Sequence, residues 1–311
     1  MKYFITGGAG FIGSHMVEAL ISEGRVTVFD NFSSGKMEFL APHRGNPDLR
    51  IKEGDCGDLK ALTKAMAGHD LVIHYAANPD IARGMYETDL DLREGTLLTY
   101  NVMEAMRLNG VSRVLYTSGS GIYGDVGTTP TSEDFGPLLP ISFYGASKLA
   151  CEGLISAFCH QYGMQSYILR MGNVVGRRQT HGVGFDFINK LRADPTRLEI
   201  LGDGTQSKSY VHVSDVIAAH IFVAQNTTDT VNVFNLATDD FIDVTSIAEI
   251  VVAEMGLSPV ELAYSGGDRG WKGDVPKVRL PCAKLKALGW RVKHDSRQAM
   301  TRSVREMLGK E

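Results

Sequence analysis

Residues 3–13, which read YFITGGAGFIG, decide the fold. An apolar run, Tyr3–Thr6, meets a glycine-rich turn that contains both GxGxxG and GxxGxxG, and a helical pattern follows. Glycine is needed where the chain turns off a strand, where backbone approaches a pyrophosphate, and where the helix packs on the sheet. The start of that helix would offer unpaired N–H groups to phosphate. The stretch predicts the strand, turn and helix of a dinucleotide-binding unit.

An acidic residue follows this turn at the spacing that a dinucleotide site requires. Asp30 comes after a second apolar run, Arg25–Phe29, and lies about 20 residues beyond Gly10. A carboxylate there accepts hydrogen bonds from the adenine ribose of NAD and repels the 2′-phosphate of NADP. Residues 31–35 bring no arginine to neutralise that phosphate. The sequence therefore predicts NAD as the cofactor.

The first half of the chain alternates short apolar runs with longer helical patterns, which is typical of βαβ units. The expected strands are Tyr3–Thr6, Arg25–Phe29, Leu49–Glu53, Leu71–Tyr75, Arg113–Thr117 and Gln165–Arg170. The expected helices are Phe11–Ser22, Leu59–Ala67, Leu92–Asn109 and Tyr144–Tyr162. Strands that are each reached through a helix predict an α/β fold with a doubly wound parallel sheet, the Rossmann arrangement.

The pattern changes after Arg170, where loops rich in glycine, arginine and aspartate separate shorter elements. Further helices are expected at Phe185–Arg192, Ser214–Ala224, Val244–Glu254 and Ser296–Leu308, and a strand at Val231–Leu236 could return to the main sheet. We predict an NAD-binding domain over residues 1–170 with a return segment at 211–237. Residues 171–210 and 238–311 would form a smaller, partly interleaved α/β substrate domain.

Composition excludes several other classes of protein. The 311 residues carry 32 Lys and Arg against 36 Asp and Glu, and this lack of a basic excess argues against nucleic acid as a partner. The four cysteines form no CxxC pair, and no histidine stands at metal-ligand spacing with them, so neither disulfides nor a metal are expected. The first residues leave no room for a signal peptide, and no apolar run is long enough to span a membrane. A cytoplasmic location is expected.

A tyrosine and a lysine stand four residues apart at Tyr144 and Lys148. On a helix this spacing puts the phenol and the ammonium on one face. A nearby ammonium lowers the pKa of a phenol, and the nicotinamide of NAD⁺ would add a second positive charge. The pair therefore suggests a tyrosine that acts as a base near neutral pH.

Several motifs follow one another along the chain in a set order. They are residues 6–15, 29–35, 54–58, 74–77 and 123–124, the Tyr144/Lys148 pair, and residues 170–176 and 202–206. Together they resemble the extended short-chain dehydrogenase/reductase family, and within it the UDP-glucose 4-epimerase-like nucleotide-sugar enzymes. The resemblance covers essentially the whole chain.

The resemblance implies roles for individual residues. The cofactor contacts would be Gly7, Gly10, Phe11, Ile12, Asp30, Asn31, Ser33, Gly35, Asp55, Cys56, Ala76, Ala77, Tyr144 and Lys148. In such enzymes Tyr144 would be the base, and Lys148 would hold the nicotinamide ribose. The substrate contacts would be Asn173 and Lys208 at the diphosphate and Gly182 and Val183 at the nucleotide. Lys208 stands where the family usually has arginine, so the charge is kept but the bidentate fork is lost.

The sequence departs from the family at the serine that assists the base. The family usually places Ser or Thr four residues before the tyrosine of the Tyr-Gly pair, and here Gly119 stands there. Ser118 and Ser120 flank it, and either hydroxyl could bond the sugar 4-OH. Ser120 is preferred because glycines on both sides would allow the loop to move. The same stretch lacks the Asp-Glu pair of the 4,6-dehydratases.

Two more departures lie elsewhere. Leu92 replaces an asparagine that is common in the family, and Trp271 fills the usual slot of a diphosphate-binding arginine. We expect Arg269 to take over that contact. Val278 would border the sugar pocket, where valine leaves room for UDP-N-acetylhexosamines or C6-modified sugars.

These residues favour NAD-dependent epimerisation at C4 of a nucleoside-diphosphate sugar, such as UDP-glucose/UDP-galactose, through a 4-keto intermediate. A dehydratase, a 4-ketoreductase or a decarboxylase of the same family is the alternative, and a non-catalytic NAD-sensing protein is the alternative of another class. The resemblance also implies a homodimer, in which Leu92–Asn109 and Tyr144–Tyr162 pair with their symmetry mates. The expected outer faces carry Leu97, Thr99 and Met103 on one helix and Leu149, Gly153 and Ala157 on the other.

Overall fold

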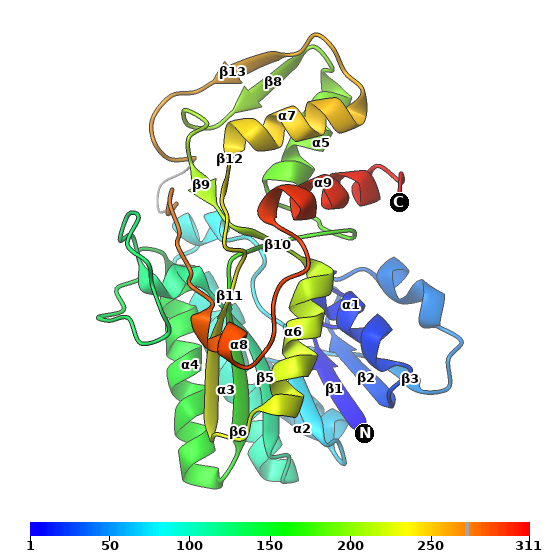
Figure 1. Ribbon diagram of the computed structural model, residues 1–311. Coiled ribbons are helices and arrows are strands. Elements are labelled where there is room, and N and C mark those ends of the chain that lie inside the picture. Colours follow the sequence, from blue (N-terminus) through cyan, green and yellow to red (C-terminus); the bar gives the residue numbers. More distant parts are fainter. Residues whose placement is uncertain (271–273) are drawn as a thin grey trace. The chain divides into compact units, whose positions relative to one another are not determined.

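Six strands within residues 2–171 and one at 231–236 form one seven-stranded sheet in the computed structural model, which describes residues 1–270 and 274–311 (Figure 1). Its strands are β1 (Lys2–Thr6), β2 (Arg25–Asp30), β3 (Leu49–Glu53), β4 (Leu71–His74), β5 (Arg113–Gly119), β6 (Gln165–Met171) and β11 (Val231–Leu236). Their order is β11-β6-β5-β4-β1-β2-β3. Because β1 pairs in parallel with both β2 and β4, the winding reverses at β1. The predicted doubly wound sheet is confirmed, and β11 is its returning strand.

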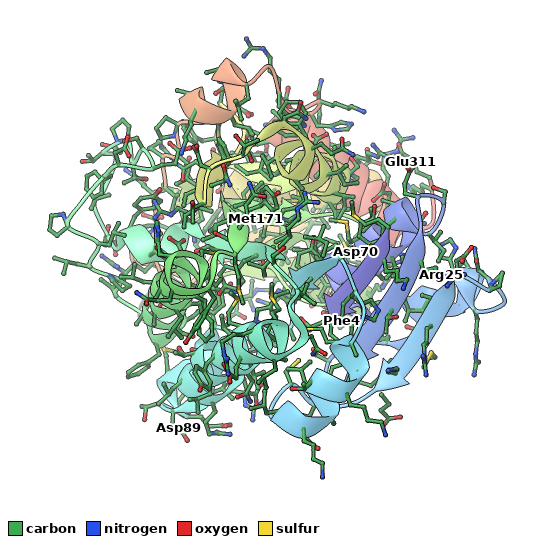
Figure 2. The ribbon with its side chains drawn as sticks, turned by 90° about the horizontal axis from the view of Figure 1, so that it is seen from below. Phe4, Arg25, Asp70, Asp89, Met171 and Glu311 are labelled. Atoms are coloured by element: carbon green, nitrogen blue, oxygen red, sulfur yellow. The ribbon has the colours of Figure 1, made fainter. Side chains whose placement is uncertain are left out.

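Helices cover the sheet. They are α1 (Phe11–Leu20), α2 (Leu59–Met66), α3 (Leu98–Asn109), α4 (Phe143–Tyr162) and α6 (Val213–Asn226). On one face α2, α3 and α4 pack together, and strand residues such as Phe4 and Val72 share a buried apolar cluster with Met103 and Ile155 from the helices. Figure 2 shows this layer from below, with Phe4 on β1. Successive strand residues point to opposite faces, so Ile5, also fully buried, belongs to the other layer.

The expected helix Leu92–Asn109 is two structures in succession. Residues Leu92–Leu97 form a π-helical turn, η3, and α3 continues from Leu98. Short π-helical segments are rare and are frequently found at functional sites. Gly95 in this turn lies against α4 so closely that a Cβ there would be 2.3 Å from Ser147 Oγ. The described part of the chain also contains three 3₁₀ turns: η1 (Met37–His43), η2 (Ala82–Met85) and η4 (Ser120–Tyr123).

The later part of the chain forms short strand pairs and a helical layer. The pairs are β7 (Asn173–Val175) with β10 (Tyr210–His212), β8 (Arg197–Ile200) with β13 (Glu261–Tyr264), and β9 (Ser207–Lys208) with β12 (Ile242–Asp243). The helices are α5 (Val183–Ala193), α7 (Val244–Met255), α8 (Ala283–Ala287) and α9 (Ser296–Met307). Phe187, Ile247 and Met300 from α5, α7 and α9 meet in one buried cluster.

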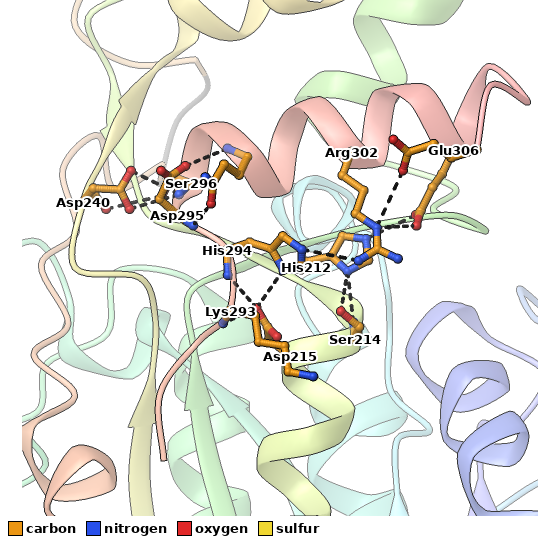
Figure 3. A network of polar contacts seen from close by, with 12 residues as sticks. His212, Ser214, Asp215, Asp240, Lys293, His294, Asp295, Ser296, Arg302 and Glu306 are labelled. Carbon is orange, nitrogen blue, oxygen red and sulfur yellow. Dashed lines mark hydrogen bonds and ion pairs between the residues drawn. The ribbon is translucent and has the colours of Figure 1, made fainter. Parts of the chain in front are cut away.

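A buried polar network ties α9 to this layer (Figure 3). Glu306 on α9 accepts a hydrogen bond from the backbone N–H of Arg177 at 2.8 Å and lies 3.2 Å from His212 Nε2. Arg302 donates to the other oxygen of Glu306 at 3.1 Å. The network therefore fastens the C-terminal helix to β10 and to the loop after β7.

The chain divides into two units by its contacts. The first contains residues 1–122, 142–170 and 217–234, and the second contains 123–141, 171–216 and 235–311. The expected boundaries differ most at 123–141, which belongs to the second unit. Thr131 N donates there to the carbonyl oxygen of Arg279 at 2.9 Å. Within the described residues, no helix is long and apolar enough to cross a membrane.

Candidate active site

The glycine-rich turn between β1 and α1 keeps the start of α1 open. Gly7 has a φ of 67°, and a Cβ there would lie 2.7 Å from the backbone nitrogen of Ala76. Gly13 allows α1 to approach the turn, since its Cβ would be 2.1 Å from Gly7 O. Gly10 is the N-cap, and no side chain of the described residues caps the N–H groups of α1, which begins with Phe11 and Ile12. This arrangement suits a pyrophosphate, which binds free N–H groups at a helix N-terminus.

The Asp30 carboxylate is fixed at the end of β2. It is buried and accepts hydrogen bonds from the N–H groups of Ala9 and Phe32, both at 2.9 Å. Burial raises the pKa of this carboxyl, while the two hydrogen bonds lower it. Gly35 closes over it, because a Cβ at Gly35 would lie 2.9 Å from Asp30 Oδ1. The carboxylate is therefore held beside the glycine turn, as the ribose contact requires.

Some of the residues expected to contact the cofactor are joined by hydrogen bonds after β2 and β3. Asn31 Nδ2 donates to Asp55 Oδ2 at 2.8 Å, and Asp55 Oδ1 accepts from Gly57 N at 2.6 Å. Ser33 N donates to Asn31 Oδ1 at 3.0 Å. Burial raises the pKa of the Cys56 thiol, so it stays uncharged and supplies apolar surface. The structure thus brings Asn31, Ser33 and Asp55 together.

The end of β4 is held to β1 by a buried histidine. His74 Nδ1 lies 2.7 Å from Thr6 Oγ1, and its Nε2 lies 3.0 Å from Thr99 Oγ1. Burial lowers the pKa of His74 to about 3, so the ring is neutral. Thr6 Oγ1 also accepts from Ala76 N at 3.3 Å, and Ala77 follows half-buried. His74 thereby fixes the two alanines expected at the cofactor.

Tyr144 and Lys148 share one face at the start of α4, as their spacing predicts. Ser142 Oγ caps this helix by accepting from Gly145 N at 3.1 Å. The buried Lys148 ammonium donates to the carbonyl oxygen of Thr117 at 2.9 Å and lies 5.5 Å from the centroid of the half-buried Tyr144 ring. The carbonyl of Thr117 has no side-chain signature, so sequence reasoning missed it.

The two candidate serines differ in their surroundings. Ser118 lies within β5 and is buried, and its hydroxyl has no hydrogen-bond partner among the described residues. Ser120 begins η4 and is half-buried. Ser118 is the next residue after Thr117, whose carbonyl holds Lys148, and Ser120 is three residues after Thr117, so both stay candidates for the 4-OH contact.

In the second unit, Asn173 lies on β7 and Lys208 on β9. Asn173 is in register with Tyr210 of β10, and its backbone N–H donates to the carbonyl oxygen of Ser209, the residue after Lys208, at 3.3 Å. Burial raises the pKa of Tyr210 to about 12, although the Asn173 side chain opposes that rise. Lys208 Nζ forms an ion pair with Asp274 Oδ1 at 2.6 Å.

Asp274 also brings Arg269 to this cluster. Arg269 Nη1 donates to the carbonyl oxygen of Asp274 at 2.8 Å, and Nη2 donates to Asp125 Oδ2 at 2.6 Å. The two cations expected at the diphosphate, Lys208 and Arg269, are therefore both joined to Asp274. Trp271, expected near this place, lies outside the described residues.

The residues of this unit that are expected to contact the nucleotide and the sugar are Gly182, Val183 and Val278. Gly182, with a φ of 101°, is the N-cap of α5, and no side chain caps that helix, whose first residue is Val183. Val278 is half-buried, and its carbonyl oxygen accepts from Arg279 Nη1 at 3.0 Å. The open start of α5 could receive an anionic group.

Comparison with known proteins agrees with this geometry. Residues 3–237 match the sequence model of the NAD dependent epimerase/dehydratase family. A putative UDP-glucose 4-epimerase of Methanocaldococcus jannaschii is 31% identical over 309 residues, which cover 97% of this chain and 97% of that protein.

Two solved enzyme structures are also similar to this chain over almost its whole length. The crystal structure of a UDP-galactose 4-epimerase superposes with a TM-score of 0.87 at 36% identity, covering 100% of this chain and 99% of that chain. The dTDP-glucose 4,6-dehydratase of Streptomyces venezuelae, solved with NAD bound, superposes with a TM-score of 0.90 at 25% identity and covers 98% and 96%.

The glycine turn and the Asp30 carboxylate provide what NAD requires, and NAD is the cofactor that this family uses. The chain belongs to the NAD dependent epimerase/dehydratase family.

Proposed function

We propose that this protein is an NAD-dependent 4-epimerase of a UDP-hexose, which interconverts UDP-glucose and UDP-galactose through a 4-keto sugar. The observation that carries the proposal is that the Lys148 ammonium donates to the Thr117 carbonyl and lies 5.5 Å from the centroid of the Tyr144 ring. Likeness to a UDP-galactose 4-epimerase and to a putative UDP-glucose 4-epimerase supports it.

The residues of the first unit supply the proton chemistry. Tyr144, as phenolate, accepts the proton of the sugar 4-OH, directly or through the hydroxyl of Ser118 or Ser120. The positive charge of Lys148 stabilises that phenolate. Bound NAD supplies a hydride acceptor and donor for C4. When the 4-keto sugar has turned about its phosphate link, Tyr144 returns the proton to the oxygen on C4.

Residues of the second unit hold the rest of the substrate in this proposal. Lys208 and Arg269 supply positive charge for the diphosphate, and Asn173 supplies an amide. Asp274 now pairs with Lys208 at 2.6 Å, so a diphosphate would compete with this carboxylate for the ammonium. A substrate held mainly by its diphosphate leaves the sugar ring free to turn, which an epimerase needs and a simple reductase does not.

Other reactions of the family are less well supported. Residues 118–121 read Ser-Gly-Ser-Gly and offer no carboxyl group for the elimination step of a 4,6-dehydratase. A 4-ketoreductase or a decarboxylase would use the same tyrosine–lysine pair, and only the product distinguishes them. A non-catalytic NAD sensor would not need this pair, and here it is intact.

We also propose a homodimer built on α3 and α4, with one change to the expected surface. Thr99 and Met103 are buried inside the first unit, so they are not available for pairing. Exposed apolar side chains on these helices and on the adjoining η3 include Leu97, Tyr100 and Tyr162, which are 50%, 43% and 55% exposed. Tyr100 and Tyr162 both pack on Phe158, and this continuous aromatic surface suits a partner helix pair.

The test is an incubation of the purified protein with a panel of UDP- and dTDP-sugars without added cofactor, with products identified by NMR. We expect UDP-glucose and UDP-galactose to interconvert. A product that has lost water or carbon dioxide, or that appears only with added NADH, would assign another reaction.

A further inference from the structure

A buried carboxyl group next to the tyrosine–lysine pair takes no part in the chemistry described so far. Asp91 immediately precedes η3 and is only 2% exposed. Its Oδ1 accepts a hydrogen bond from Asn78 Nδ2 at 2.9 Å, and Asn78 is buried as well. Within residues 1–270 and 274–311, no donor reaches the other oxygen, Oδ2. A buried carboxyl with one unsatisfied oxygen is costly, and in a native protein it calls for an explanation.

Close packing keeps water away from this carboxyl. Gly84 in η2 faces Asp91, and a Cβ at Gly84 would lie 2.8 Å from Asp91 Oδ2. Gly84 is itself buried, so the carboxyl is covered by backbone. Away from water a charge acts more strongly on its neighbours, because solvent screens it less.

Two links connect Asp91 to the turn of α4 that carries the tyrosine and the lysine. Ser147 Oγ donates to the carbonyl oxygen of Asp91 at 2.8 Å, and Ser147 directly precedes Lys148. Burial raises the pKa of the Asp91 carboxyl, whereas the hydrogen bond from Asn78 and the positive charge of Lys148 lower it. Asp91 is thus coupled to Lys148 both by a hydrogen bond to its neighbour and by charge.

The other charged groups close to Asp91 along the chain are less buried than Asp91, and Glu87 and Glu94 are half-buried. Asp80 is exposed, although its carbonyl oxygen shares the Asn78 amide at 2.9 Å, and its carboxylate accepts from Arg83 N at 3.2 Å. Arg83 forms an exposed ion pair with Glu87 at 2.7 Å. Lys148, by contrast, is buried, and its ammonium lies 5.5 Å from the centroid of the Tyr144 ring.

We propose that Asp91 is a positioning residue for the tyrosine–lysine pair. Its buried negative charge balances Lys148, and its carbonyl oxygen holds the adjoining turn of α4 through Ser147. Because Lys148 is four residues from Tyr144 on the same helix face, we expect removal of the Asp91 charge to shift the pH range in which Tyr144 serves as a base. The role matters for catalysis only if the proposed function holds, but the coupling exists in the protein without substrate.

The test compares Asp91→Asn with Asp89→Asn. The first change keeps the size of the side chain and an acceptor for Asn78, but removes the charge. The second removes the same charge two residues earlier, where the side chain is 62% exposed and pairs with Arg93. Ionisation of Tyr144 is followed with NAD bound, as the ultraviolet difference absorbance between each protein and its Tyr144→Phe counterpart. No sugar substrate is needed.

We expect Asp91→Asn to move the ionisation midpoint to lower pH by about half a unit to one unit, because a nearby negative charge no longer opposes the phenolate. Asp89→Asn should leave the midpoint in place, since water and salt screen an exposed charge. In turnover assays the acid limb of kcat should move with the midpoint while KM changes little. A merely structural residue would change the amplitude and not the position of that limb.

An unchanged midpoint in folded Asp91→Asn overturns the proposal, whatever reaction the enzyme catalyses. A shifted midpoint in a protein without epimerase activity supports it and contradicts only the proposed reaction. If Asp91→Asn does not fold, Asp91→Ser takes its place. It also removes the charge and keeps a hydroxyl acceptor for Asn78, so the midpoint should move in the same direction, and no movement overturns the proposal.

Discussion

Lys148 donates to the carbonyl oxygen of Thr117 at 2.9 Å, and its charge lies over the ring of Tyr144. The tyrosine and the lysine could be found from the sequence, because their spacing places both on one helix face. Thr117 and Asp91 could not. One acts through its backbone, and the other shows its importance only through burial and an unsatisfied oxygen.

At the residue scale, replacing each of the two serines after Thr117 should change kcat by a different amount. If Ser120 contacts the sugar, Ser120→Ala should lower kcat more than Ser118→Ala, since glycines on both sides let its hydroxyl move to the substrate. Steady-state rates with UDP-galactose decide between them. The reverse ranking would assign the contact to Ser118, and equal, wild-type rates would leave Tyr144 acting alone.

The carboxylate of Asp30 predicts that the protein prefers NAD to NADP. The wild-type protein should bind NAD more tightly than NADP, and Asp30→Ala should narrow that difference by removing the negative charge that repels the 2′-phosphate. Calorimetric Kd values for both dinucleotides measure it. Asp30→Asn is the matched control, because it keeps an acceptor for the Ala9 N–H. A wild-type protein that prefers NADP would contradict the role of Asp30.

At the scale of elements, the periodicity of apolar residues in the sequence does not reveal η3 or the polar network of α9. The spacing of apolar residues predicts one helix over Leu92–Asn109, but it does not distinguish a π-helical turn from an α-helical one. That turn forms where Gly95 must fit against Ser147, a contact between segments far apart in sequence. Strands of two to four residues in the second unit were missed as well, because they are too short to show alternation.

Glu306 on α9 predicts a pH-dependent stability (Figure 3). Burial alone would raise its pKa, but His212, the Arg177 N–H and Arg302 outweigh that effect and lower it to about 2. A carboxyl whose pKa falls on folding stabilises the native state above its unfolded pKa, and this contribution is lost as the pH falls towards 2. Glu306→Gln should therefore lower the free energy of unfolding by about 2–3 kcal/mol at neutral pH.

Urea denaturation of Glu306→Gln at neutral pH and in acid measures this effect. The difference from wild type should shrink in acid, where the wild-type carboxyl also becomes protonated. The exposed Glu249→Gln on α7 is the control and should change little at either pH. An equal loss for Glu306→Gln under both conditions would show a packing defect rather than a charge effect.

At the scale of the whole chain, the order of elements in the first half could be predicted because each βαβ unit has its own strand and helix signals. The returning strand was found at Val231–Leu236, with the bounds that the structure shows. The assignment of residues 123–141 to the second unit could not be foreseen. It depends on contacts such as that between Asp125 and Arg269, which no local pattern reveals.

The exposed surface of α3 and α4 predicts a dimer. Light scattering at micromolar concentration should give twice the mass of the 33.9 kDa chain. Tyr100→Glu, which puts a charge on the aromatic surface, should shift the protein towards monomer, while Leu108→Glu near the end of α3 tests a second exposed apolar position on the same helix. A wild-type monomer under these conditions would contradict the proposed interface.

The central claim is that Tyr144 is the base of a C4 epimerase, and the initial rate of UDP-galactose conversion by wild type and Tyr144→Phe tests it most directly. The variant should fold and bind NAD as the wild type does. It should lose at least about 10²–10⁴-fold in kcat, because positioned proton transfer contributes a factor of that size. A Tyr144→Phe protein that interconverts UDP-galactose and UDP-glucose at close to the wild-type rate would contradict the account.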